Sequence, residues 1–185
     1  MSRTALLLER LATLIHQSVR EEAALHGLLP IHLQVLAYLA RANRYSDLPI
    51  AVAEYFGITR GTVSQTVTLL ERRGLIAKTP DEHHGRRIHL TLTAAGEAVL
   101  SGGWSRRLDE ALRASGDDDA VLESMLRTLL ATLQRHNGSR PFGLCRQCAH
   151  FRSEAHDHRC GLTGEALSSE QTGKICRDWT ARRAA

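Results

Sequence analysis

The most informative absence in this chain is cysteine, which does not occur in the first 144 residues although four cysteines lie in the last 41. Long apolar runs are also missing, since no stretch approaches the roughly 20 apolar residues that span a bilayer. The N-terminal segment, MSRTALLLERLATLIHQ, mixes Arg, Glu and His with its leucines, unlike the apolar centre of a signal peptide. These absences argue against a membrane or secreted protein, and we expect a cytoplasmic one.

Several enzyme signatures are missing as well. The chain has no phosphate-binding Gly loop, no His-Glu-x-x-His and no Ser/His/Asp arrangement with a suitable context, and we interpret His32 and Glu54 as helix surface. We therefore expect no enzymatic activity. Aromatic residues make up only 4% of the chain, so the core must consist mainly of Leu, Ala, Val and Ile. The formal charge of +4, with Arg outnumbering Lys, suits a polyanionic partner.

Helical periodicity is clear in the first 74 residues. Gly27 can end the first helix in a left-handed conformation, Pro30 suits the start of the second, and Thr59 is a suitable N-cap for the fourth. Gly57 and Gly74 are expected to stop the third and fourth helices. The four expected helices are residues 3–26, 30–42, 49–57 and 59–74.

After residue 74 the spacing of apolar residues changes to the alternation of β-strands, which predicts a hairpin. LIAKTP and RIHLTLT are β-branched or alternating, and the polar DEHHGR between them forms a charged tip. Helical pattern returns over 93–115 and 120–136, and NGSRPFG is the best boundary in the chain. We therefore predict two domains, 1–137 and 138–185.

The order helix, short helix, turn, helix and hairpin predicts a winged helix-turn-helix, with the helix-turn-helix at about 48–74 and the wing at about 75–92. In the second helix of the pair, Val63, Val67 and Leu70 are spaced to face the core. The remaining polar side chains suit base and phosphate contacts in the major groove, and two arginines flank the wing tip. The predicted DNA-binding residues are Arg60, Thr62, Ser64, Gln65, Thr68, Arg86 and Arg87.

Residues 3–137 resemble the MarR family of bacterial transcription regulators, through TRGTVSQTVTLLERRGLIAK and GRRIHLTLTAAGE and through the long helices on either side. Arg86 fits the Asp-x-Arg of the family's wing, but His84 stands in place of the Asp. The resemblance implies a homodimer joined by its N-terminal helix and last two helices, bound to a near-palindromic site on double-stranded DNA with recognition helices about one DNA turn apart.

All four cysteines fall within a 32-residue window, spaced Cys145-x2-Cys148-x11-Cys160-x15-Cys176. In a cytoplasm that keeps thiols reduced, such a group indicates metal ligands or a redox centre before structural disulfides. The window is also too short, and too weakly periodic, to fold on a core of its own. Because a metal bound by four thiolates supplies the missing free energy, we predict that these cysteines are metal ligands.

The spacing leaves the metal open. Structural zinc sites usually show two close Cys pairs, whereas one pair with two single cysteines is nearer to the layout of high-potential [4Fe–4S] sites. CRQCAHF, RCGL and ICRDW look similar to small modules of that kind, with Phe151 and Trp179 placed to shield a cluster. The alternatives are zinc, a metal-free thiol–disulfide switch, or a Cys3His site that uses His150, His156 or His158.

We therefore predict a mainly α protein with a small β-hairpin wing, long N- and C-terminal dimerisation helices and a small irregular cysteine-rich module. We expect a repressor whose [4Fe–4S] cluster senses redox state, oxygen, nitric oxide or iron by changing how the tail packs on the terminal helices. One alternative is a MarR-type regulator with structural zinc and a small-molecule effector. Another is an electron-transfer or interaction protein that uses the cysteine module.

Overall fold

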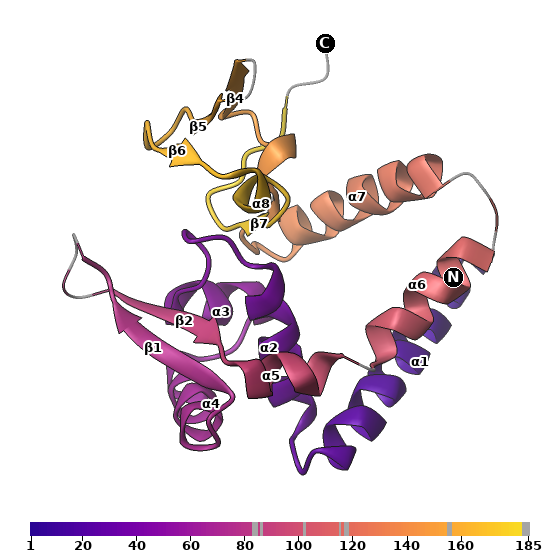
Figure 1. Cartoon of the computed structure of the whole chain (residues 1–185). Coiled ribbons are helices and arrows are strands. Elements are labelled where there is room, and N and C mark those ends of the chain that lie inside the picture. The colour runs from indigo at the N-terminus through magenta and orange to yellow at the C-terminus, as the bar shows by residue number, and fades with distance from the viewer. Residues whose placement is uncertain are drawn as a thin grey trace.

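The computed structural model describes residues 1–82, 85, 87–101, 103–114, 116, 119–154 and 157–182. Helices dominate the chain up to residue 136, and the hairpin projects from them (Figure 1). The elements of this part are α1 (Arg3–Leu25), α2 (Pro30–Arg41), α3 (Pro49–Phe56), α4 (Arg60–Arg72), β1 (Ile76–Pro80), β2 (Ile88–Leu92), α5 (Ala94–Leu100), α6 (Trp104–Ala114) and α7 (Asp119–His136). The predicted winged helix-turn-helix fold is confirmed.

The ends of α3 and α4 follow from local chemistry. Gly57 adopts φ 63° and ends α3, since a left-handed residue there costs glycine little. Thr59 caps α4, because its Oγ1 accepts the backbone N–H of Thr62 at 3.1 Å. Gly74, at φ 66°, turns the chain into the wing. The strands β1 and β2 are antiparallel, with Ile76 opposite Leu92 at the base.

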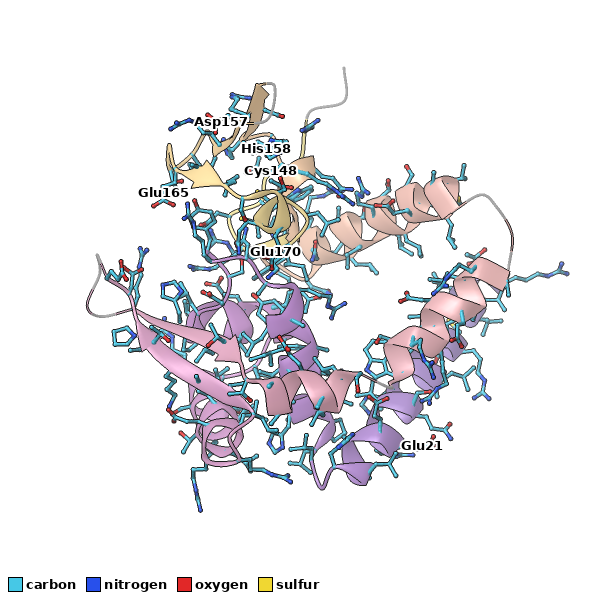
Figure 2. All side chains as sticks on the ribbon, in the orientation of Figure 1. Glu21, Cys148, Asp157, His158, Glu165 and Glu170 are labelled. Carbon is cyan, nitrogen blue, oxygen red and sulfur yellow. The ribbon has the colours of Figure 1, made fainter. Side chains whose placement is uncertain are left out.

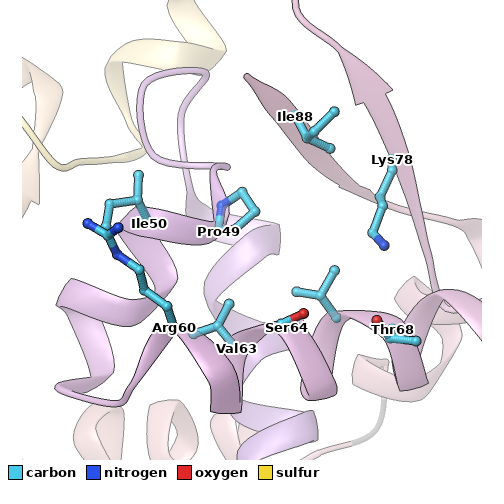
Figure 3. Close-up of a pocket in the computed structure, with 9 residues that line it drawn as sticks. Pro49, Ile50, Arg60, Val63, Ser64, Thr68, Lys78 and Ile88 are labelled. Atoms are coloured by element: carbon cyan, nitrogen blue, oxygen red, sulfur yellow. The ribbon is translucent and has the colours of Figure 1, made fainter. Parts of the chain in front are cut away.

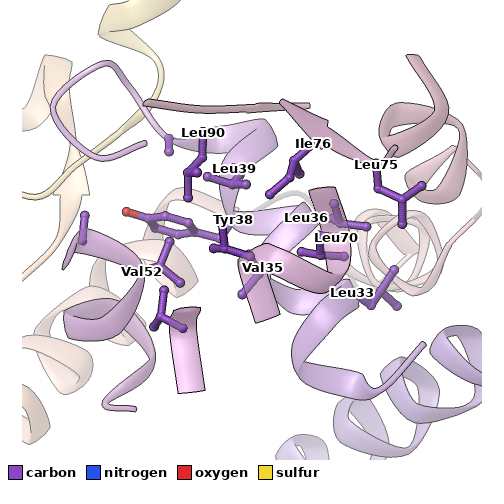
Figure 4. Close-up of a cluster of buried hydrophobic side chains, with 14 of the residues drawn as sticks. Leu33, Val35, Leu36, Tyr38, Leu39, Val52, Leu70, Leu75, Ile76 and Leu90 are labelled. Atoms are coloured by element: carbon purple, nitrogen blue, oxygen red, sulfur yellow. The ribbon is translucent and has the colours of Figure 1, made fainter. Parts of the chain in front are cut away.

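The core lies between α2, α3, α4 and the base of the wing (Figure 4). Leu36, Tyr38 and Leu70 are fully buried, and burial of each such side chain is worth about 1.5–3 kcal/mol. Tyr38 also needs a partner for its hydroxyl, which donates to the carbonyl of Ser46 at 2.8 Å. The interpretation of His32 as surface was wrong: it is buried, and its Nδ1 accepts the backbone N–H of Leu29 at 3.2 Å.

The chain beyond α7, here called the tail, is more regular than expected. Its elements are β3 (Gly143–Leu144), a 3₁₀ turn (Cys145–Gln147), β4 (Phe151–Glu154), β5 (Asp157–Cys160), β6 (Ala166–Leu167), α8 (Ser169–Thr172) and β7 (Ile175–Cys176). Strand β3 pairs with β7, and β4, β5 and β6 form a three-stranded sheet. The strands are two to four residues long, which is too short for a periodic pattern to show in the sequence.

Apolar side chains remain exposed along three helices of the isolated chain. These are Leu6, Leu7, Leu11, Leu14 and Leu25 on α1, Leu112 on α6, and Val121, Leu122, Met125, Leu126, Leu129, Leu130 and Leu133 on α7. Among the described residues no single helix is long and apolar enough to cross a membrane, while α1 with α2 passes such a test only as a pair bent by 98°.

Candidate DNA-binding face and cysteine site

Helix α4 exposes the side chains that the sequence pattern assigned to DNA. Arg60, Thr62, Ser64, Gln65 and Thr68 are all exposed. Their neighbours at positions 63, 66, 67 and 70 are buried and hold the helix against the core. The helix therefore presents one polar face, which is the arrangement that a recognition helix needs.

A groove of about 500 Å³ separates α4 from the wing (Figure 3). Arg60, Ser64 and Thr68 line it from the helix, and Lys78 and Ile88 line it from the strands. Thr62 and Gln65 are exposed on the same helix but do not line this groove. The groove thus gathers three of the predicted residues beside a wing that could follow the DNA backbone.

Lys78 was missed by the sequence reasoning, although a signal for it exists. Alternation along β1 puts Lys78 on the face that carries the buried Ile76, and that face continues over the groove. Its Nζ lies 2.6 Å from Glu71 Oε2, at the end of α4. Lys78 therefore adds a positive charge to the groove, next to the predicted contacts.

Of the two wing arginines, Arg87 lies among the described residues. Arg87 is exposed at the start of β2 and lines a hollow of about 320 Å³ that it shares with Arg44 and Arg177. Arg86, like His83 and His84 in the tip, lies outside the described residues. Contact of Arg86 and Arg87 with DNA stays a prediction.

A histidine held by two carboxylates joins the wing to the loop between α2 and α3 (residues 42–48, the α2–α3 loop). His89 Nδ1 lies 2.6 Å from Asp47 Oδ1, and its Nε2 lies 3.1 Å from Asp81 Oδ2. Burial opposes the charged ring, but the two carboxylates outweigh burial and raise the pKa of His89 above its ordinary value. The ring therefore joins the wing to the loop, and the two carboxylates favour its protonated form.

Substitution of His89 by Gln is expected to lower the free energy of unfolding by about 1 kcal/mol at pH 6. The raised pKa means that the histidine's contribution is fully present below pH about 6.5 and is lost as pH rises through the folded-state value. Thermal unfolding of both proteins from pH 6 to 9 should show the wild-type advantage shrinking. An advantage that stays constant across this range would contradict the charged clamp.

The four cysteines converge on one cavity within the tail, which is where Figure 2 places Cys148. Cys145 begins the 3₁₀ turn and Cys148 follows it, while Cys160 and Cys176 end β5 and β7. Cys145, Cys148 and Cys176 are buried, Cys160 is half-buried, and all four are free thiols. Their cavity is small, with a volume of about 10 Å³, so the four side chains lie close around it.

The sulfur atoms lie in a setting of hydrogen-bond donors. The backbone N–H of Thr180 donates to Cys148 Sγ at 3.3 Å. Burial raises the pKa of Cys176, while donors from Asn43 and the Asp178 backbone oppose that shift. Burial, and then the three other cysteines, raise the pKa of Cys145 to about 12. Donors aimed at sulfur are the partners that thiolate ligands commonly have.

All four cysteines line this cavity, together with Tyr45 and Asp178. Among the described residues, which include all four cysteines, no three His, Cys, Asp or Glu side chains are grouped closely enough to hold one metal ion.

The aromatic and histidine side chains near the cysteines take distinct positions. Phe151 and His150 line the cavity. Trp179 packs against the buried cysteines and lies over Gly143, where a Cβ would meet its ring at 2.6 Å. His158 contacts Ser153 at 3.0 Å through Nδ1, and His156 lies outside the described residues. Only His150 of the described candidates lines the cavity.

The tail docks on the α2–α3 loop and on α3 (Figures 1 and 2). Glu54 is half-buried on α3, and its carboxylate pairs with Arg177 of the tail, a contact that the interpretation as helix surface did not include. On the same side, the rings of Tyr55 and Phe142 meet edge to face with centroids 5.2 Å apart. The cysteine cavity is therefore beside the helix-turn-helix, and the loop residue Tyr45 forms part of its wall.

Comparison with known proteins agrees with the fold. Residues 26–87 match the model of the MarR family. S. aureus MepR in its DNA-binding conformation has a TM-score of 0.63 at 20% identity, covering 72% of this chain and 100% of its own. The S. aureus MepR–DNA complex has a TM-score of 0.56 at 20% identity, covering 72% and 100%. CouR from Rhodococcus jostii RHA1, bound to p-coumaroyl-CoA, has a TM-score of 0.55 at 23% identity, covering 71% and 92%.

These likenesses show that the chain has a MarR-type winged-helix fold. The full-length matches still leave more than a quarter of this chain without a counterpart. No curated protein sequence matches the chain.

Proposed function

We propose that this chain is a homodimeric transcription repressor of MarR type that binds double-stranded DNA and holds a [4Fe–4S] cluster in its tail. Cys145, Cys148, Cys160 and Cys176 are the proposed ligands. The cluster supplies the sensing chemistry when bound, in response to redox state, oxygen, nitric oxide or iron. The single observation that carries the sensing part is the convergence of all four cysteines on one cavity.

DNA binding is supported by the exposed polar face of α4 and by the groove beside it. Arg60 and Lys78 bring positive charge to the two sides of that groove, and the chain as a whole has a net charge of +4. The likeness to MepR in its DNA-binding conformation supports the same function. We infer that α4 enters the major groove while the wing lies along the backbone.

The homodimer is supported by the apolar residues that α1, α6 and α7 leave exposed. Monomeric proteins rarely expose so many apolar side chains on neighbouring helices. A second copy that covers them by twofold symmetry would place two α4 helices on one duplex, about 34 Å apart for adjacent half-sites. A near-palindromic operator follows from this symmetry.

The cluster is supported by the donor set and by the spacing of the cysteines. Four thiols that line one cavity supply the four thiolate ligands that a [4Fe–4S] cluster uses. The N–H of Thr180 beside Cys148 Sγ and the half-buried Phe151 suit a cluster held in a partly shielded position. Structural zinc is the competing outcome of the test.

The test is a metal analysis and visible spectrum of protein purified without air, followed by DNA binding. We expect about four irons per chain and a broad charge-transfer band at about 400 nm. A colourless protein with one zinc per chain would contradict the sensor and would indicate a structural zinc site. Binding to DNA from upstream of its own gene should weaken steeply with salt. A redox-active cluster without DNA affinity would instead indicate an electron carrier.

A further inference from the structure

We propose that the cysteine site acts on the helix-turn-helix through the α2–α3 loop, with the ion pair between Arg177 and Glu54 as the direct link. This inference rests on the proposed function, because it assigns the route by which an occupied cysteine site alters DNA binding. It also replaces the expected route through the terminal helices. The route is built from backbone hydrogen bonds, one buried amide and one ion pair.

The first step joins a cysteine to the loop through the backbone. Strand β7 ends at Cys176, and the preceding residue Ile175 forms a parallel bridge with Ala42. The backbone N–H of Asn43 donates to the carbonyl of Ile175 at 2.9 Å. The proposed ligand Cys176 therefore follows directly on a residue that is hydrogen-bonded to the loop.

The second step is the side chain of Asn43, which is fully buried. Its Oδ1 accepts the backbone N–H of Tyr45 at 3.1 Å and the hydroxyl of Ser46 at 2.9 Å. Its Nδ2 is buried and has no hydrogen-bond partner among the described residues. Asn43 therefore continues the backbone contact with Ile175 into the loop through the two bonds that its Oδ1 accepts.

The third step is Arg177, the residue after Cys176. Its backbone N–H donates to Ser46 Oγ at 2.7 Å. Its guanidinium donates to both carboxylate oxygens of Glu54 on α3, at 2.6 and 2.8 Å. This bidentate pair fixes geometry as well as charge, because the planar guanidinium matches the carboxylate. A shift of Cys176 therefore changes the position of α3.

The loop also reaches the wing. The carbonyl of Asp47 accepts the backbone N–H of Leu90 at 2.8 Å, and its carboxylate holds His89 at 2.6 Å. The loop thus contacts the cysteine site on one side and the wing strand β2 on the other. By comparison, the contact with α7 is lighter, with the Gln147 amide donating to Glu123 at 3.3 Å. The polar network favours the helix-turn-helix as the element that responds.

The experiment compares DNA affinity of each full-length protein with its cluster loaded and with the cluster removed by chelation under anaerobic conditions. The duplex is the DNA upstream of the protein's own gene, and the readout is the ratio of the two dissociation constants. We expect Glu54→Gln and Arg177→Met to reduce the wild-type ratio at least fivefold while iron content stays unchanged. The double variant should lose no more than Glu54→Gln alone, because both substitutions remove the Arg177–Glu54 pair and only Glu54→Gln also removes the contact with Arg140 at 3.8 Å.

Lys174→Met is the matched control, since it removes one positive charge two residues before Cys176. Lys174 pairs with Glu170 inside the tail at 2.7 Å, so this variant should keep the ratio within twofold of wild type. Arg177→Lys keeps the charge without the bidentate geometry and tests the route if Arg177→Met unfolds. A wild-type ratio that survives Glu54→Gln and both Arg177 variants overturns the route and leaves the proposed function standing. A protein without a cluster, or with a ratio of one, overturns both.

Discussion

Replacement of Ser64 by Glu is expected to weaken DNA binding by about 100-fold or more at moderate salt. Ser64 is exposed on α4 and lines the groove between that helix and the wing, so a carboxylate there would face the phosphates and base edges. Helical propensity changes little between Ser and Glu, so the fold should survive. The measurement is a gel shift or fluorescence titration across a range of salt concentrations.

Ser64→Ala is the matched control, because it removes the same hydroxyl without adding charge. We expect it to weaken binding by less than about tenfold, in line with the loss of one hydrogen bond. If Ser64→Glu bound DNA as well as wild type while unfolding at the same temperature, α4 could not be the helix that enters the major groove. Equal losses in both variants would instead point to a direct contact of the hydroxyl.

Replacement of Cys148 by Ser is expected to remove the cluster completely, so that iron falls to background and the visible band disappears. Cys148 is buried in the cavity wall with the other three cysteines, and a serine hydroxyl is a far weaker ligand for iron than a thiolate. The winged-helix part should stay folded, because Cys148 is outside its core cluster, to which the described residues of the tail contribute only Phe142 and Ile175. Iron analysis, absorption and circular dichroism give the three readouts.

His150→Ala is the control for this experiment, since His150 lines the same cavity. It should retain about four irons per chain if the ligands are four cysteines. Loss of metal in His150→Ala, with retention in Cys160→Ser, would establish a Cys3His site instead. Unfolding of the whole protein in Cys148→Ser would make the tail part of the fold and would contradict its role as a sensor.

The helix-turn-helix was predictable because its signals are local. Gly57 and Thr59 mark the turn through backbone conformation and capping, and Val63 and Val67 mark the buried face through a period that any α-helix shares. The exposure of the five residues of α4 that were predicted to contact DNA follows from the same period. A local pattern does not predict how α4 is rotated about its axis relative to the wing. This rotation decides that Ser64 lines the groove and Gln65 does not.

The docking of the tail was not predictable from these signals. Arg177 and Glu54 are 123 positions apart, and each looks like an ordinary charged surface residue in the sequence. Asn43 lies in a loop, where an asparagine usually indicates an exposed turn. Its burial next to the tail therefore could not be predicted from the sequence pattern. The strands of the tail are likewise too short to show alternation. Pairings of this kind depend on tertiary contacts that no single segment encodes.

The burial of Asn43 beneath the tail means that the tail does not form an independent domain. Ile175 of the tail forms backbone contacts with Ala42 and Asn43, and Arg177 of the tail pairs with Glu54 on α3. A protein engineer who fused residues 138–185 to another winged helix would leave Asn43, Ser46 and Glu54 behind. The fusion protein would contain the four cysteines but would lack the residues on which the tail docks. A substitution in the tail that alters this docking is therefore expected to need a compensating substitution among residues 42–54, in evolution as in protein engineering.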